Sequence, residues 1–143
     1  MAPYISLKKA NGYSDLINDE NVLVTADTVV IINNKILGKP KNRQEAFQML
    51  KQLSGNKHNV ITGVTLKTKD KTETFSCDTL VEFDNLSDEE IWNYVDEYRP
   101  FDKAGSYGIQ EWIGFRAIKK INGCFYNVMG LPLNLLHQHL KNL

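Results

Sequence analysis

The residue in this sequence best placed for chemistry is an aspartate inside an apolar run. Asp27 interrupts the run from Val22 to Ile32, and a carboxylate is costly to bury unless it has a partner or a role. For an aspartate taken alone, capping a turn or pairing with a nearby lysine is the commoner case. The alternative is a general base or metal ligand at the end of a central strand, where α/β sheets place their sites.

Lysines in short glycine-bearing segments are the next candidates. Lys39 follows Gly38 and precedes Pro40; glycine allows close approach of a ligand to the backbone, and lysine is a point charge suited to phosphate. Lys9 lies beside Lys8 on an expected helix. A lysine before a proline, or one of two adjacent lysines on a helix, is more often a solvated surface residue. Both interpretations stay open on the residues alone.

A third segment, Asp102-Lys103-Ala104-Gly105, leads to Tyr107-Gly108-Ile109-Gln110. The Asp102–Lys103 pair could be an exposed ion pair of little energy. Gln110 could bind a nucleotide base or only hydrogen-bond its own loop. Taken together, one carboxylate, three lysines and one amide suit a polyphosphate ligand with a divalent metal.

The composition excludes several classes of function. The chain has 143 residues, of which 42% are hydrophobic, and this fits one domain with a real core. Lys and Arg total 17 and balance 17 Asp and Glu, so no global basic field predicts a nucleic-acid partner. No apolar run has membrane-spanning length, and the start is not a signal peptide. Cys77 and Cys124 are expected to be buried free thiols of a cytoplasmic protein.

The order of the expected elements predicts an α/β fold. A mixed sheet of several long strands is flanked by helices. The two-residue segments Asn33-Asn34 and Asn122-Gly123 predict hairpin turns. The expected helices cover residues 4–17, 42–53, 87 to 94 or 96, and a last segment from 131 onward; the expected strands cover 22–32, 59–67, 72–83, 113–121 and 124–128, and residues 99–110 form an ordered loop.

Five segments in register resemble the Maf family of nucleoside triphosphate pyrophosphatases, once described as septum-formation inhibitors. The resemblance runs from about Tyr4 to the C-terminus. The five segments are Ala26 to Val30, Leu37 to Pro40, Leu53-Ser54-Gly55 with His58-Asn59-Val60, Asp102 to Gln110, and Asn127 to Pro132.

The resemblance implies an α/β fold with a cleft between two lobes, similar to inosine triphosphatases, and often a homodimer. It also implies hydrolysis of a nucleoside triphosphate to the monophosphate and pyrophosphate, with Mg²⁺ or Mn²⁺. By motif match Asp27, Lys39 and Lys9 are catalytic, and Asp27 also binds the metal. Gln110, Lys103 and Asp102 bind the substrate. The form of the Asp102 to Gln110 segment is similar to that of the subgroup acting on dTTP and UTP.

The sequence departs from the family pattern at its start, where the segment S-x-S-P-R-R and a functional glutamate are absent. We therefore expect residues 1–143 to be one Maf-like domain that is truncated at its N-terminus. Phosphate binding should be weakened, because arginine is the bidentate phosphate ligand. The alternative function is a nucleotide-binding or assembly module with impaired catalysis, and a plain α/β domain is the third hypothesis.

Overall fold

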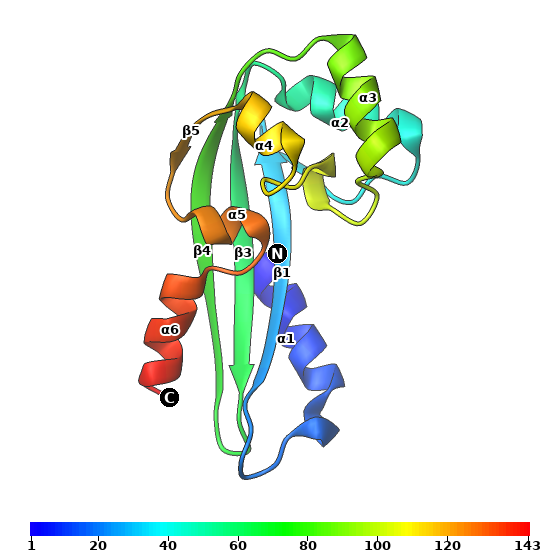
Figure 1. The fold of residues 1–143 in the computed structure, drawn as a ribbon. Coiled ribbons are helices and arrows are strands. Elements are labelled where there is room, and N and C mark those ends of the chain that lie inside the picture. Colours follow the sequence, from blue (N-terminus) through cyan, green and yellow to red (C-terminus); the bar gives the residue numbers. More distant parts are fainter. The chain divides into compact units, whose positions relative to one another are not determined.

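The computed structural model describes all residues from 1 to 143, and it confirms the α/β class (Figure 1). No helix is long and apolar enough to cross a membrane. Helices precede, separate and follow the strands along the chain. The elements are α1 (Ala2–Gly12), η1 (Ser14–Leu16), β1 (Leu23–Ile32), β2 (Lys35–Leu37), α2 (Arg43–Leu53), β3 (Lys57–Lys67), β4 (Thr72–Phe83), α3 (Asp88–Tyr98), η2 (Ala104–Ser106), α4 (Trp112–Ala117), β5 (Ile118–Asn122), α5 (Phe125–Met129) and α6 (Leu133–Lys141).

The strands form one five-stranded sheet in the order β2-β1-β3-β4-β5. β1 and β2 are antiparallel, with Val30 opposite Leu37. The turn between them is the expected one, because Asn33 and Asn34 have positive φ angles of 50° and 63°. Asparagine tolerates this backbone conformation better than most residues, which explains why a two-residue connection suffices.

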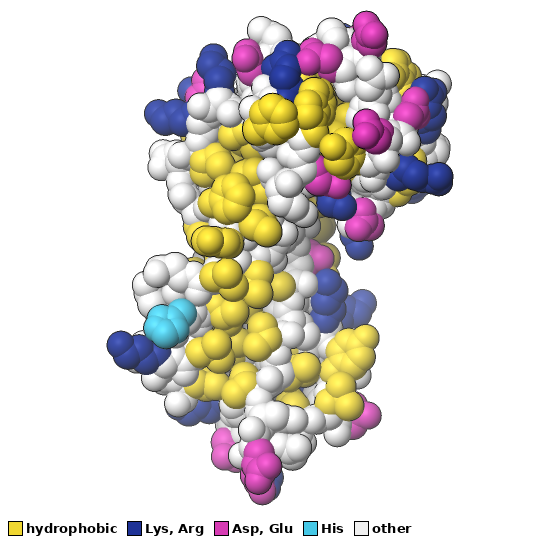
Figure 2. Space-filling view, viewed as in Figure 1, with side chains coloured by type: hydrophobic (Ala, Val, Ile, Leu, Met, Phe, Trp, Pro, Cys, Tyr) yellow, Lys and Arg dark blue, Asp and Glu magenta, His cyan; other side chains and the backbone are white.

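The chain forms two compact units. The first unit contains Met1–Thr28, Ile61–Asp78 and Cys124–Leu143, and the second contains Val29–Val60 and Thr79–Gly123. In the first unit, the side chains of Val64, Leu66 and Leu136 form a buried cluster, onto which Ala26, Phe75 and Leu131 pack. Figure 2 shows hydrophobic side chains gathered over the strands of this unit, between α6 and α1.

Helix α1 lies on β3 at a glycine. Ala2, Ser6 and Ala10 are its buried residues, and all three have small side chains. A methyl group placed on Gly63 would lie 2.3 Å from the carbonyl carbon of Ala2, which is far inside van der Waals contact. The helix backbone therefore approaches the strand more closely than any other residue at position 63 would allow.

Helices α2 and α3 of the second unit begin at the predicted caps. The Asn42 side chain accepts a hydrogen bond from the Glu45 amide at 2.8 Å. Ser87 and Glu90 form a reciprocal capping box at the start of α3. Helices α2 and α3 pack against each other, and the rings of Phe47 and Trp92 stack between them with centroids 4.2 Å apart.

The predicted hairpin around Asn122-Gly123 is wrong. Residues 112–117 and 125–129 are the helices α4 and α5, and only β5 is a strand. β5 pairs with β4, where Val81 lies opposite Ile121, so its partner comes from far upstream in the chain. Within α4, only a glycine fits at position 114, because a methyl group there would lie 1.8 Å from the Ile109 carbonyl oxygen. Tertiary contacts thus override a strong local turn signal.

Smaller differences concern ends and burial. The first helix ends at Gly12 rather than near residue 18, since glycine weakens a helix. Helix α3 continues to Tyr98, and Arg99 then takes a left-handed conformation with φ of 48°. Cys77 and Cys124 are thiols as expected, but both are half-buried rather than buried.

We predict that Gly63→Ala destabilises the protein by about 1–3 kcal/mol, because the added methyl group forces the backbone of α1 away from β3. Urea unfolding followed by circular dichroism would measure this loss. Gly12→Ala is the matched control, since a methyl group there meets nothing within 4 Å. The prediction fails if both variants unfold at the urea concentration of the parent chain.

Candidate active site

Lys9 and Asp27 lie side by side in the first unit. Lys9 Nζ donates a hydrogen bond to the Ala26 carbonyl oxygen at 2.9 Å and lies 3.6 Å from Asp27 Oδ1. The two side chains are 47% and 21% exposed, respectively. A solvated cation and a half-buried carboxylate are therefore held next to each other through a backbone oxygen of β1.

Two hydroxyl contacts between α1 and the sheet set this arrangement. Thr25 Oγ1 donates to the Ser6 carbonyl oxygen at 2.6 Å, and the hydroxyls of Ser6 and Thr65 are 2.8 Å apart. Lys9 follows Ser6 by three residues and shares its helix face. Asp27 follows Thr25 by two residues and shares its sheet face. The contact between Ser6 and Thr25 thus brings Lys9 to Asp27.

The residue after Asp27 is fixed by a chain of polar contacts. Thr62 Oγ1 donates to the Asn127 carbonyl oxygen at 3.2 Å, so its oxygen is left to accept from Thr28 Oγ1 at 2.9 Å. The fully buried Asn127 donates from Nδ2 to the Cys77 carbonyl oxygen at 3.1 Å. These contacts tie β1 to β3, to β4 and to α5. The backbone that carries Asp27 is therefore rigid, as a catalytic group requires.

The remaining predicted site residues lie in the second unit, on two loops that meet. The Gly105 amide donates to the Gly38 carbonyl oxygen at 3.1 Å and joins the Lys39 loop to the Asp102 loop. Lys103 Nζ donates to Asp102 Oδ1 at 3.1 Å. This hydrogen bond, aided by the charges of Lys103 and Lys39, lowers the pKa of Asp102. Asp102 therefore stays ionised between two lysines.

The backbone of the Asp102 loop has two residues in the left-handed region. Gly105 has φ of 70° and is pressed against Val30, where a methyl group would lie 2.9 Å from a Val30 methyl carbon. Ser106 has φ of 68°, which is unusual for a residue with a side chain. Its hydroxyl is buried and donates to Met49 Sδ at 3.1 Å. Packing against β1 and α2 holds this strained segment in place.

Lys103 and Gln110 converge over the backbone of Gly108. A methyl group on Gly108 would lie 2.9 Å from Glu111 Oε1, 2.9 Å from Lys103 Cε and 3.2 Å from Gln110 Nε2. The Glu111 amide donates to the Gly108 carbonyl oxygen at 3.0 Å, so residues 108–111 form a closed turn. A cationic and an amide side chain, both suited to a nucleotide, therefore meet beside the Glu111 carboxylate at this turn.

The structure thus gathers the predicted residues into two sets, one in each unit. The first set is Lys9 and Asp27; the second is Lys39, Asp102, Lys103 and Gln110. Their roles in catalysis and binding remain predictions.

A comparison with known protein families gives a match over the whole chain. The Maf family, described as "Maf-like protein", matches residues 1–143. This chain belongs to the Maf family.

Curated relatives of this Maf chain share one name. A "dTTP/UTP pyrophosphatase" of Porphyromonas gingivalis is 55% identical over 141 residues, which cover 97% of this chain and 71% of the relative. Proteins of the same name from Parabacteroides distasonis and Bacteroides thetaiotaomicron are 52% and 51% identical, over 97% and 98% of this chain and 72% of each relative.

Asp27 is the expected metal ligand of this Maf chain. No cluster of three or more His, Cys, Asp or Glu side chains could hold a metal ion. Mg²⁺ in nucleotide enzymes is commonly bound by one or two carboxylates, substrate phosphates and waters. One carboxylate that is 21% exposed fits such a shared site.

Sequence reasoning missed three residues that hold the Gln110 loop. Two of them, Tyr94 and Glu111, contact each other, and the third is His58. His58 is 1% exposed, and its Nε2 lies 2.7 Å from the Tyr107 hydroxyl. Burial lowers the pKa of His58 to about 4, so the ring is neutral. The signal available was the segment His58-Asn59-Val60, which the resemblance matched without giving the histidine a role.

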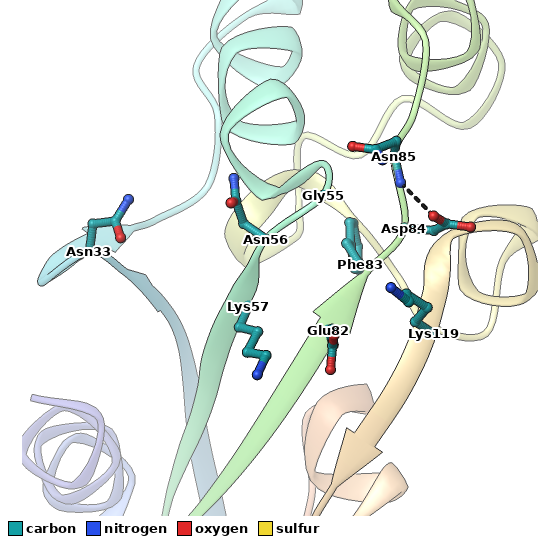
Figure 3. Close-up of a pocket in the computed structure, with 9 residues that line it drawn as sticks. All are labelled: Asn33, Gly55, Asn56, Lys57, Glu82, Phe83, Asp84, Asn85 and Lys119. Atoms are coloured by element: carbon teal, nitrogen blue, oxygen red, sulfur yellow. Dashed lines mark hydrogen bonds between the residues drawn. The ribbon is translucent and has the colours of Figure 1, made fainter.

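A polar hollow elsewhere in the second unit contains none of the predicted site residues (Figure 3). Its volume is about 370 Å³. Two lysines and two carboxylates balance each other among its side chains, and only Phe83 is buried. Such a neutral, open surface does not favour a polyphosphate. The lining residues are Asn33, Gly55, Asn56, Lys57, Glu82, Phe83, Asp84, Asn85 and Lys119.

The neutral His58 predicts a loss of stability in acid. The folded pKa of about 4 lies below the ordinary value of 6.5, so the unfolded chain binds more protons between these values. Through His58 alone, the free energy of unfolding should fall by on the order of 3 kcal/mol as the pH drops through this window. Urea unfolding at several pH values would measure it.

The control is His58→Gln, which keeps a polar partner for Tyr107 but does not titrate. Its stability should depend less steeply on pH than that of the parent chain over the same window. Parallel pH profiles of the two proteins would show that His58 is not the group responsible.

Proposed function

We propose that this Maf chain hydrolyses dTTP, UTP and modified pyrimidine nucleoside triphosphates. The products are the nucleoside monophosphate and pyrophosphate. The observation that carries the proposal is the match, over nearly the whole chain, to relatives named dTTP/UTP pyrophosphatase at 55% and 52% identity. The site geometry also supports the proposal, because Lys9 is paired with Asp27, and Lys103 converges with Gln110.

The reaction is an in-line attack of water on the α-phosphorus. A bond forms between the water oxygen and phosphorus, and the bond from phosphorus to the bridging oxygen of pyrophosphate breaks. Asp27 accepts the proton of the attacking water, a role that requires an ionised and fixed carboxylate. Lys9, held at the Ala26 carbonyl, offsets negative charge that develops on the phosphate oxygens.

The residues of the second unit serve binding. Lys39 and Lys103 neutralise phosphate oxygens, and the Asp102 carboxylate orients the Lys103 ammonium. Gln110 offers both a donor and an acceptor to the edge of a pyrimidine. A divalent cation, Mg²⁺ or Mn²⁺, would be held by Asp27 together with the substrate phosphates, and it supplies further neutralisation of charge.

Single substitutions in the first set test the assignment. We expect Asp27→Asn to lower kcat/KM for UTP at least about 100-fold, and Lys9→Met to lower it about 10-fold or more. Lys8→Met is the matched control, because Lys8 is the exposed neighbour of Lys9 and should keep the parent rate. The measurement is pyrophosphate release from a panel of nucleoside triphosphates.

Two results would contradict the proposal. An unchanged rate in Asp27→Asn would remove the catalytic role of this carboxylate. UTP binding without hydrolysis by the parent chain would favour the alternative of a nucleotide-binding module with impaired catalysis.

Removal of divalent metal tests the cofactor. With UTP as substrate, we expect a chelator to reduce pyrophosphate release to the background rate and added Mg²⁺ or Mn²⁺ to restore it. Full activity in the presence of excess chelator would contradict a metal requirement.

Two further expectations, one from the resemblance and one from the sequence, concern the state of the protein in the cell. We propose a homodimer, which analytical ultracentrifugation would test, and a cytoplasmic location, where the nucleotide substrates are found.

A further inference from the structure

The hydroxyl of Tyr94 holds both ends of the turn that carries Gln110. The Gly108 amide donates to Tyr94 Oη at 3.2 Å, and Tyr94 Oη donates to Glu111 Oε1 at 2.5 Å. Glu111 in turn donates its amide to the Gly108 carbonyl oxygen at 3.0 Å. One buried oxygen thus fixes the first and the last residue of the turn, and Gln110 lies between them as its exposed member.

Tyr94 is itself held rigidly. Its side chain is 1% exposed, and its ring stacks on Tyr98 with centroids 5.0 Å apart. Helix α3, which carries it, begins at a full capping box and is tied to α4 by the Arg116–Glu90 pair at 2.6 Å. The pKa of Tyr94 is raised by burial and by the bond to Glu111, so its proton remains available for donation.

The side chains above the turn depend on this anchor. Lys103 Cε and Gln110 Nε2 lie over Gly108 in the space that a side chain would fill at that position. A shift of the Gly108 backbone would therefore change the surface that the Lys103 and Gln110 side chains contact. The Tyr94 hydroxyl contacts both ends of the turn and so connects them to α3.

We propose that Tyr94 is a positioning residue for base selection: its hydroxyl locks the Gly108–Glu111 turn and so fixes the direction in which Gln110 presents its amide. This rests on the proposed function, in which Gln110 contacts the pyrimidine. A fixed amide presents its donor and acceptor in one order, so it accepts uracil or thymine and leaves a polar group unpaired against cytosine. A mobile amide loses conformational entropy when the nucleotide binds, and it discriminates less between uracil and cytosine.

The test substitution is Tyr94→Phe, which removes only the hydroxyl. We expect the dissociation constant for UTP to rise about fivefold or more, and the preference for UTP over CTP to fall by a similar factor. Both are measured by calorimetry. In turnover, KM for UTP should rise while kcat changes less than about twofold, because Lys9 and Asp27 are not altered.

Two further variants separate positioning from general stability. Tyr98→Phe removes a hydroxyl from the stacked neighbour and should leave the UTP preference unchanged. Glu111→Gln keeps an acceptor for the Tyr94 proton and should retain most of the preference. Hydrogen exchange of the Gly108 amide, followed by NMR, should accelerate at least about fivefold in Tyr94→Phe and stay slow in Tyr98→Phe.

The possible failures are distinguishable. If the parent chain binds UTP but does not hydrolyse it, the proposed function fails, while the affinities and the exchange of Gly108 still decide the role of Tyr94. If Tyr94→Phe keeps the parent preference for UTP over CTP, the positioning role is overturned, even where the melting temperature falls. If the parent chain binds neither nucleotide, both proposals are overturned.

Discussion

The docking of α1 on β3 at Gly63 is the constraint on which the first unit depends. The backbone of α1 lies so close to the strand that position 63 has no room for a side chain, since a methyl group there would lie 2.3 Å from the Ala2 carbonyl carbon. The hydroxyl of Ser6 then meets β3 on one side, and its carbonyl meets Thr25 of β1 on the other. The place of Lys9 relative to Asp27 follows from these contacts, although Lys9 itself is exposed.

Much of the fold was predictable where the signal is local. Asn33 and Asn34 adopt positive φ in a two-residue turn, and Ser87 caps α3 by bonding to Glu90 three residues later. A few consecutive residues therefore decide each of these structures. The sequence Asn122-Gly123 carries an equally strong local signal, yet the chain after it is helical. β5 finds its partner in β4 instead, and pairing over such a distance in the sequence depends on packing that no short segment encodes.

The candidate site shows the same division. Asp27 stands out because a carboxylate interrupts an apolar run, and Lys103 and Gln110 belong to a segment with a recognisable order of residues. Tyr94 and His58 could not be predicted, because each acts through one atom on a loop that lies 14 and 49 residues further along the chain, respectively. In the sequence, a tyrosine on an amphipathic helix and a histidine in a strand resemble ordinary core residues. Only the fold shows which groups their polar atoms contact.

Energetics distinguish the residues that hold the fold from those that we propose to serve chemistry. Lys9 and Asp27 are 3.6 Å apart and partly solvated, and such ion pairs contribute about 0–1 kcal/mol to stability. Two charged side chains kept on a rigid backbone for so small a gain are poor candidates for a structural role. Gly63 and His58, by contrast, are buried, so neither is open to a substrate. We therefore expect that Asp27 and Lys9 can be altered while the contacts that position them remain.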